Sequence, residues 1–111
     1  MKYFAFTLDL RNDPAVIAAY KEYHRKVWPE IERNQRRVGF MKTRIFLHGR
    51  WLFMYYETTD DYDPKTAFAE SIKDPKGAEW EHLMRESFQE PLPDAGPGEW
   101  WLPMELVYAL D

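Results

Sequence analysis

The sequence predicts an α+β fold in which four antiparallel strands and two helices alternate in the ferredoxin-like order β-α-β-β-α-β. Three observations lead to this prediction: an aromatic-rich run at 3–10, two apolar runs joined by a glycine-bearing link at 40–58, and two stretches with helical spacing. The helices of such a fold cover one face of the sheet. The other face is then free for a ligand or for a second subunit.

Residues 3–10 are aromatic and partly alternating, which is typical of a strand. The first helix is expected to begin at residues 12–14, Asn-Asp-Pro, because a capping side chain is followed by proline at the first helical position. Apolar side chains then recur at steps of three and four along residues 16–31, which predicts an amphipathic helix. Pro29 lacks an N–H group, so we expect a kink or a break there and an end near Gly39.

Residues 40–47 and 51–58 are apolar runs separated by His-Gly-Arg at 48–50, a pattern that predicts a β-hairpin. A polar connector then leads into a second helical region that reaches about Phe88. The pair Asp74-Pro75 predicts a break within that region.

The last part of the chain is predicted to be a loop followed by a strand. Residues 91–98 hold three prolines and two glycines, which indicates an extended connection. Residues 101–110 are largely apolar and predict the final strand. No repeat or linker interrupts the chain, and its 111 residues fit one domain over 1–111.

The composition excludes several classes of protein. The formal net charge of −4, with acids and bases interleaved, argues against a nucleic-acid partner. No apolar run is long enough to cross a membrane, and the start of the chain does not look like a signal peptide. With no cysteine there is no disulfide framework. We therefore expect a cytoplasmic protein.

His24 is the first candidate for proton chemistry. Tyr20 lies four residues earlier, so the two side chains meet on one helical face. A neutral imidazole beside a phenol can exchange protons near neutral pH, because its unperturbed pKa is about 6.5. Alternatively, His24 packs against the sheet and bonds a backbone carbonyl; spacing alone favours this second interpretation.

The remaining titratable residues are weaker candidates. His48 falls in the predicted hairpin turn, and His82 lies on a different helical face from Trp80. No two histidines have the spacing of metal ligands, so no metal is expected. The acidic run at 60–63 lacks the pattern of a calcium loop and is better interpreted as a helix cap and a solvated turn.

Several aromatic and charged side chains are candidates for binding a ligand. Trp80, Trp100 and Trp101 either stack on a sugar or another planar ligand, or pack within the fold, with Trp80 as a core contact of the second helix. Trp28 is interpreted at this point as part of a helix cap. Arg44 and Glu105 are charges within predicted strands. They either hold the hydroxyls of a polyhydroxy ligand or bond each other.

Several of these residues belong to a pattern found in a known family, and the resemblance extends over nearly the whole chain. The sequence resembles the L-rhamnose mutarotase family, most specifically in the pattern His-x-x-x-Trp-Pro-Glu at 24–30. The match also includes Tyr20, Gly39, the strand-turn-strand at 44–57, and Trp80 with Met84. The ending, with Gln-Glu-Pro-Leu-Pro at 89–93, looks more like the L-fucose branch of that family.

The resemblance implies a dimeric α+β barrel enzyme, without metal or cofactor, that interconverts the α and β anomers of a 6-deoxy-L-hexopyranose. It implies a homodimer that binds a monosaccharide. His24 matches the catalytic acid/base, and Tyr20 and Trp80 match residues of the sugar site. Thr43 and Glu81 stand where the L-rhamnose enzymes have a tyrosine and a tryptophan, and these two departures count against L-rhamnose as the preferred sugar.

The chemistry of mutarotation suits such a chain. A proton must leave the anomeric hydroxyl and a proton must reach the ring oxygen, so that the ring opens, the C1–C2 bond rotates and the ring closes again. One acid/base group typically contributes about 10²–10⁴-fold. We expect His24 to shuttle the proton, Tyr20 to orient it or complete the relay, and Trp80 with Trp28 to stack on the sugar.

Two other functions fit the same fold. One is a cofactor-independent monooxygenase of the dimeric α+β barrel type, which needs an apolar slot for a planar substrate. The other is a non-enzymatic module that binds a small ligand and needs no acid/base group. A mutarotase instead needs a polar site with a histidine at its centre.

Overall fold

A computed structural model describes residues 1–111, the whole of the sequence. The elements in chain order are β1 (Lys2–Leu10), α1 (Pro14–Arg25), α2 (Pro29–Arg37), β2 (Phe40–His48), β3 (Trp51–Thr58), α3 (Pro64–Ser71), α4 (Pro75–Ser87), β4 (Gln89–Glu90) and β5 (Leu102–Pro103). The predicted α+β order is confirmed, with each predicted helix divided in two. No helix combines the length and the apolar character that a membrane span requires.

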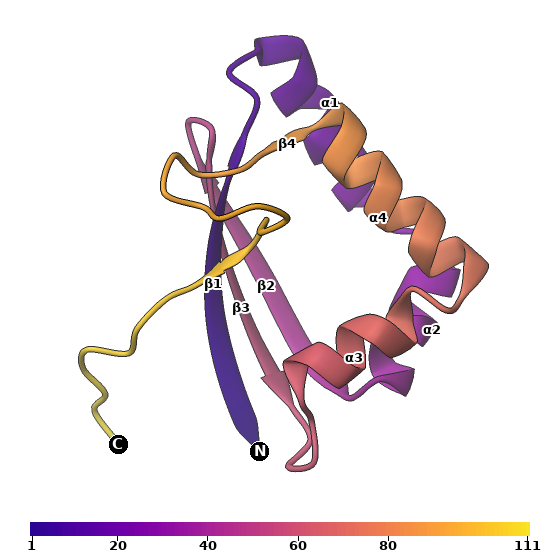
Figure 1. Ribbon diagram of the computed structural model, residues 1–111, viewed down its shortest axis with the longest axis vertical. Coiled ribbons are helices and arrows are strands. Elements are labelled where there is room, and N and C mark those ends of the chain that lie inside the picture. Colours follow the sequence, from indigo (N-terminus) through magenta and orange to yellow (C-terminus); the bar gives the residue numbers. More distant parts are fainter.

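The strands form one antiparallel sheet in the order β2-β3-β1-β4, and β5 also pairs with β1. All four helices lie on one side of this sheet (Figure 1). Side chains alternate along each strand, so Leu8 and Leu52 face the helices while their neighbours Thr7 and Phe53 face the other way. The sheet therefore has one covered face and one open face.

Both predicted helix breaks occur, and local chemistry explains them. Three helices begin with an Asp-Pro pair, in which the carboxylates of Asp13, Asp63 and Asp74 accept backbone N–H groups of the first turn at 2.9–3.0 Å. Pro29 starts α2 in the same position, although no side chain caps that helix. Gly39 follows α2 with a φ of 113°, which is the usual helix-ending role of glycine.

The predicted final strand is largely wrong. Only Leu102–Pro103 pairs with β1, and the backbone N–H of Met104 adds one bond to the carbonyl of Ala5 at 2.8 Å. Residues 104–111 have no regular structure, are exposed, and run away from the sheet on the side opposite the helices (Figure 1). Their apolar sequence has strand propensity, and residues 2–4 of β1 pair only with β3 and so have one free edge. The segment nevertheless leaves this edge after Met104, so strand propensity alone did not produce pairing.

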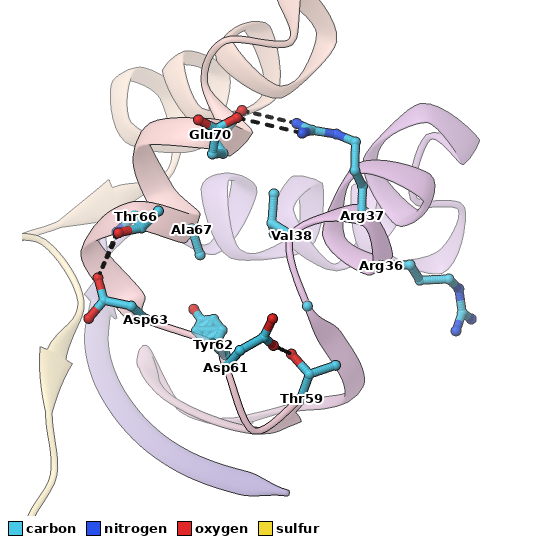
Figure 2. Close-up of a pocket in the computed structure, with 11 residues that line it drawn as sticks. Arg36, Arg37, Val38, Thr59, Asp61, Tyr62, Asp63, Thr66, Ala67 and Glu70 are labelled. Atoms are coloured by element: carbon cyan, nitrogen blue, oxygen red, sulfur yellow. Dashed lines mark hydrogen bonds and ion pairs between the residues drawn. The ribbon is translucent and has the colours of Figure 1, made fainter.

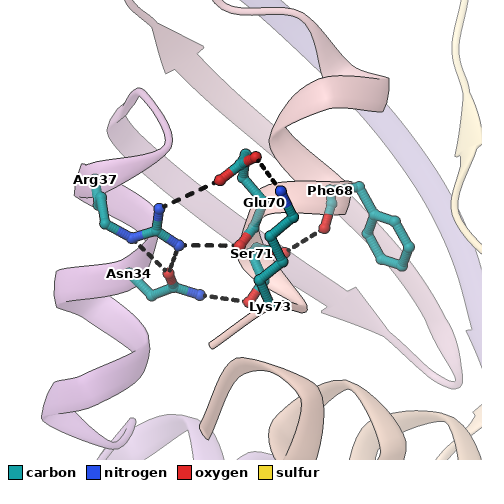
Figure 3. Close-up of polar contacts among 6 residues, drawn as sticks. All are labelled: Asn34, Arg37, Phe68, Glu70, Ser71 and Lys73. Carbon is teal, nitrogen blue, oxygen red and sulfur yellow. Dashed lines mark hydrogen bonds and ion pairs between the residues drawn. The ribbon is translucent and has the colours of Figure 1, made fainter. Parts of the chain in front are cut away.

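A polar network joins α2 to the corner between α3 and α4 (Figure 3). The buried Asn34 donates to the carbonyl of Ser71 at 2.9 Å and accepts from the guanidinium of Arg37 at 2.6 Å. Arg37 also donates to the carbonyl of Glu70 at 3.0 Å. Gly77 packs so closely here that a Cβ at its position would lie 2.2 Å from the Ser71 carbonyl oxygen. This network fixes the position of α3 and α4 relative to α2.

Candidate active site

A cavity of about 720 Å³ lies between the covered face of the sheet and the helices. Every layer of the fold contributes to its wall: Tyr20 and His24 from α1, Thr43 from β2, Trp80 from α4, and Trp101 from the loop before β5. Apolar and aromatic side chains form the larger part of the lining, and charged, amide and hydroxyl side chains make up much of the rest. This mixture is typical of sites that bind small molecules, and it differs from a purely apolar slot.

His24 lies in the last turn of α1, and its ring is held by the helix itself. Nδ1 is 2.8 Å from the backbone carbonyl oxygen of Tyr20, one turn earlier. A carbonyl oxygen only accepts, so Nδ1 carries the proton and donates it in this bond. In the neutral ring Nε2 then holds a free lone pair, which makes it the atom that accepts a proton.

The surroundings of His24 keep the imidazole neutral. The ring lies 4.1 Å from the ring of Tyr20 and 5.5 Å from that of Trp80, measured between centroids. Burial lowers the pKa of His24 below its usual value, an effect only partly offset by the bond to the Tyr20 carbonyl. A neutral histidine that lines a cavity is suited to act as a general base near pH 7.

Tyr20 is almost completely buried, and burial raises the pKa of its phenol well above the usual range. The hydroxyl is therefore protonated under all ordinary conditions. The group that holds the His24 ring is the backbone carbonyl of Tyr20 rather than its side chain. A bond to a backbone carbonyl is what the second interpretation of His24 predicted. The two rings do meet on one helical face, as the spacing predicted.

Trp80 and Trp28 have different places in the structure. Trp80 lines the cavity beside His24. Trp28 packs edge-on against Trp80, with 5.0 Å between ring centroids, and Lys76 Nζ lies 5.4 Å from the Trp28 ring centre. Trp28 does not line the cavity, so its position is that of a support behind Trp80.

The structure separates two predicted binding residues from this cavity. Thr43 lines it, but Arg44 follows directly along β2 and therefore lies on the open face of the sheet. Its guanidinium donates to the carbonyl of Thr43 at 2.9 Å. Glu105 lies in the exposed segment beyond β5. Within one chain, neither charge reaches a ligand in the cavity, and they do not bond each other.

Several polar residues that line the cavity were not singled out as binding candidates from the sequence, among them Glu81, Arg85 and Gln89. Glu81 and Arg85 face it from α4, with Arg85 Nε 2.8 Å from a carboxylate oxygen of Glu81. Arg85 also lies 5.2 Å from the ring centre of Trp100, in the loop that closes this end of the cavity. Gln89 is the third. Glu81 directly follows Trp80, and Arg85 lies four residues after Glu81 on the same helical face. This spacing is a sequence signal by which the first two could have been found.

A second hollow, of about 500 Å³, lies at the ends of α2 and β3 (Figure 2). Most of its charged groups are engaged in bonds within the chain. Arg37 pairs with Glu70 at 3.8 Å, and Asp63 accepts from the hydroxyl of Thr66 at 2.9 Å. No histidine lines it. The larger cavity is therefore the better candidate for an active site.

Comparison with known proteins shows the family of the chain. The family model described as L-rhamnose mutarotase matches residues 3–110. The chain belongs to the L-rhamnose mutarotase family. Mutarotases are carbohydrate isomerases, so the chain is an enzyme of that class. Membership of this family favours a mutarotase over the two alternatives that the sequence left open, a monooxygenase and a non-enzymatic binding module.

Relatives of this mutarotase-family chain match it from end to end. A UPF0734 protein from Dictyostelium discoideum is 46% identical over 113 residues, which cover 99% of this chain and 90% of the relative. An L-fucose mutarotase from Xanthomonas campestris pv. campestris is 38% identical over 112 residues, which cover 99% of this chain and 89% of the relative.

A solved structure has the same fold as this member of the family. The crystal structure of an L-rhamnose mutarotase from Formosa agariphila superposes with a TM-score of 0.73 and covers 100% of both chains. The two sequences are 23% identical, so this likeness bears on the fold.

Proposed function

We propose that this enzyme interconverts the α and β anomers of a 6-deoxy-L-hexopyranose, with L-fucose preferred over L-rhamnose and His24 as the acid/base. The observation that carries the proposal is the orientation of His24. Its Nδ1 is fixed by the Tyr20 carbonyl at 2.8 Å, which leaves Nε2 as the proton acceptor of a histidine that lines a cavity large enough for a monosaccharide.

One imidazole is sufficient for the reaction. Nε2 accepts the proton of the anomeric hydroxyl, and the resulting imidazolium donates a proton to the ring oxygen as the bond from C1 to that oxygen breaks. The product is the open-chain aldehyde. After rotation about C1–C2, the same steps in reverse close the ring as the other anomer, and His24 returns to its neutral form. The aromatic walls of Tyr20 and Trp80 keep this exchange out of bulk water.

Two observations support the preference for L-fucose. The chain is 38% identical to an L-fucose mutarotase over 99% of its length. Thr43 and Glu81, the residues at which it departs from the L-rhamnose enzymes, both line the cavity. L-Fucose and L-rhamnose differ in configuration at C2 and C4, so side chains in contact with the sugar determine which of the two fits.

The test is saturation-transfer NMR on equilibrated L-fucose and L-rhamnose, which reports anomer exchange directly. We expect the unmodified chain to accelerate exchange, more for L-fucose. His24→Gln is expected to lower kcat by about 10²–10⁴-fold, the usual contribution of one acid/base group. The matched control is His82→Gln, which makes the same change at an exposed histidine outside the cavity and is expected to retain the parent rate.

The outcomes separate the parts of the proposal. No acceleration of either sugar by the unmodified chain contradicts the activity. Full activity in the His24→Gln variant removes His24 from its role and leaves the activity intact. Faster exchange of L-rhamnose than of L-fucose contradicts the sugar preference alone.

We also propose that the enzyme is a homodimer formed through the open face of the sheet. This face exposes large apolar side chains from three strands: Tyr3, Phe46, Trp51 and Phe53. The segment at 104–110 exposes five more large apolar side chains on the same side, where it has no partner in its own chain. A second copy supplies both a sheet face and an apolar segment to cover them, since each chain carries the two surfaces.

A further inference from the structure

The amide oxygen of Gln89 is a buried polar atom without a partner. The residue is 5% exposed, and no group of the protein donates to its Oε1 atom. A buried amide oxygen left without a hydrogen bond normally destabilises a fold, so such groups are uncommon and call for an explanation.

The position of Gln89 directs its side chain to the cavity. Gln89 is opposite Leu10 in the pairing of β4 with β1, and Leu10 belongs to the core under the helices. Both side chains therefore lie on the covered face. Gln89 lines the same cavity as Tyr20 and His24. Its neighbour Glu90 lies on the other face, where Arg50 donates to it at 2.9 Å.

The surroundings of Gln89 explain why the missing partner does not come from the protein. The core cluster at this end of the cavity consists of Leu10, Tyr20, Leu52, Met84 and Phe88. Aliphatic and ring carbons dominate this cluster and offer the amide almost no donors. The cavity is thus where a molecule with hydroxyl groups can supply the bond.

We propose that Gln89 is a sugar-binding residue whose amide hydrogen-bonds the ring hydroxyls of the deoxysugar, which rests on the mutarotase function proposed above. An amide offers an acceptor and a donor side by side, and neighbouring ring hydroxyls both donate and accept, so the two groups are complementary. A sugar with a misplaced hydroxyl leaves the buried amide unpaired. Gln89 therefore contributes to the choice between sugars as well as to affinity.

The test is Gln89→Met, which retains the length of the side chain and removes the amide. The probes are methyl α-L-fucopyranoside and methyl α-L-rhamnopyranoside, which bind as pyranoses but cannot mutarotate, because they have no free anomeric hydroxyl. We expect the Kd of the fucoside to rise about 3- to 10-fold, which corresponds to one hydrogen bond between neutral groups. The KM for L-fucose should rise in parallel, with kcat nearly unchanged.

Thermal stability distinguishes binding from a structural role. Because the amide oxygen is unpaired in the free protein, Gln89→Met should retain or raise Tm while binding weakens. The control Glu90→Met changes the next residue of the same strand on the opposite face. It should bind both glycosides like the parent and lose some stability with the Arg50 pair.

Each remaining outcome is decisive. Parent-like glycoside binding by Gln89→Met overturns the role of Gln89, as does a fall in its Tm, which indicates a structural amide. Failure of the unmodified chain to bind either glycoside also overturns it. A different result would contradict the proposed function: the unmodified chain would bind the glycosides but would not accelerate anomer exchange of the free sugars.

Discussion

At the scale of single residues, the site depends on a bond between a side chain and its own helix. The Tyr20 carbonyl is one turn before His24 and holds Nδ1 at 2.8 Å. The backbone thus selects the tautomer in which Nε2 is basic, without the help of a second titratable side chain. Burial beside two aromatic rings then maintains the neutral form.

The direction of the pKa shift of His24 predicts how activity depends on pH. In the proposed mechanism the neutral ring is the active base, and its pKa is lowered from the ordinary value of 6.5 because the ring is buried. Activity should therefore reach its plateau by about pH 7.5, and the midpoint of its acid limb should lie below pH 6.5. The measurement is kcat/KM for L-fucose against pH, corrected for exchange without enzyme. An acid limb with its midpoint above pH 7 would show that the active base is not a buried neutral histidine.

At the scale of elements, proline positions and caps divide the helices so that they bend around the cavity. The break before Pro29 ends α1 just after His24. The break before Pro75 starts α4 so that Trp80 falls beside that histidine, at 5.5 Å between ring centroids. The network of Asn34 and Arg37 fixes the second of these corners against α2.

Gly77→Ala tests the close packing at that corner. Alanine favours a helix over glycine by up to about 1 kcal/mol. The added Cβ, however, would lie 2.2 Å from the Ser71 carbonyl oxygen and 2.7 Å from Asn34 Nδ2. The clash involves backbone, so we expect a net loss of about 1–3 kcal/mol in the free energy of unfolding, measured by urea denaturation.

A control on the same helix gives the scale for this effect. Glu79→Ala, at an exposed position, should change the free energy of unfolding by no more than about 0.5 kcal/mol. If Gly77→Ala is as stable as that control, then Gly77 does not pack closely against the Ser71 carbonyl and the Asn34 side chain.

At the scale of the whole molecule, the fold has two sides with different roles. The covered face of the sheet holds the cavity, and the open face carries exposed rings such as Phe46, 58% exposed, and Trp51, 57% exposed. Patches of this kind are more typical of interfaces than of surfaces in contact with water. The proposed sugar site and the proposed dimer contact therefore lie on opposite faces of the sheet.

Phe46→Glu tests the proposed dimer. Light scattering at micromolar concentration should give the parent a mass about twice its chain mass of 13.4 kDa. Phe46→Glu should shift the mass toward the monomer, because each subunit then buries an unpaired carboxylate at the contact. Ile72→Glu, which changes an exposed apolar residue at the end of α3, should leave the dimer intact. A monomeric parent chain would exclude the dimer.

The sequence was sufficient wherever the deciding signal is local. Asp-Pro pairs, the glycine after α2 and the spacing of apolar residues predicted the order of elements and both helix breaks. The meeting of Tyr20 and His24 also follows from the helical period alone. The segment at 101–110 has an equally good local pattern for a strand, yet only Leu102–Pro103 pairs, because pairing depends on a distant neighbour.

Tertiary structure alone decided which side chains share the cavity. Alternation along β2 places Thr43 and Arg44 on opposite faces, but only the packed helices determine that the face of Thr43 is the covered one. The same packing sets Trp28 behind Trp80 and leaves the Gln89 amide buried without a partner. The physical reason is the distance in sequence between the residues that interact. Caps, turns and the helical period depend on residues a few positions apart, whereas burial and contact depend on where distant elements come together.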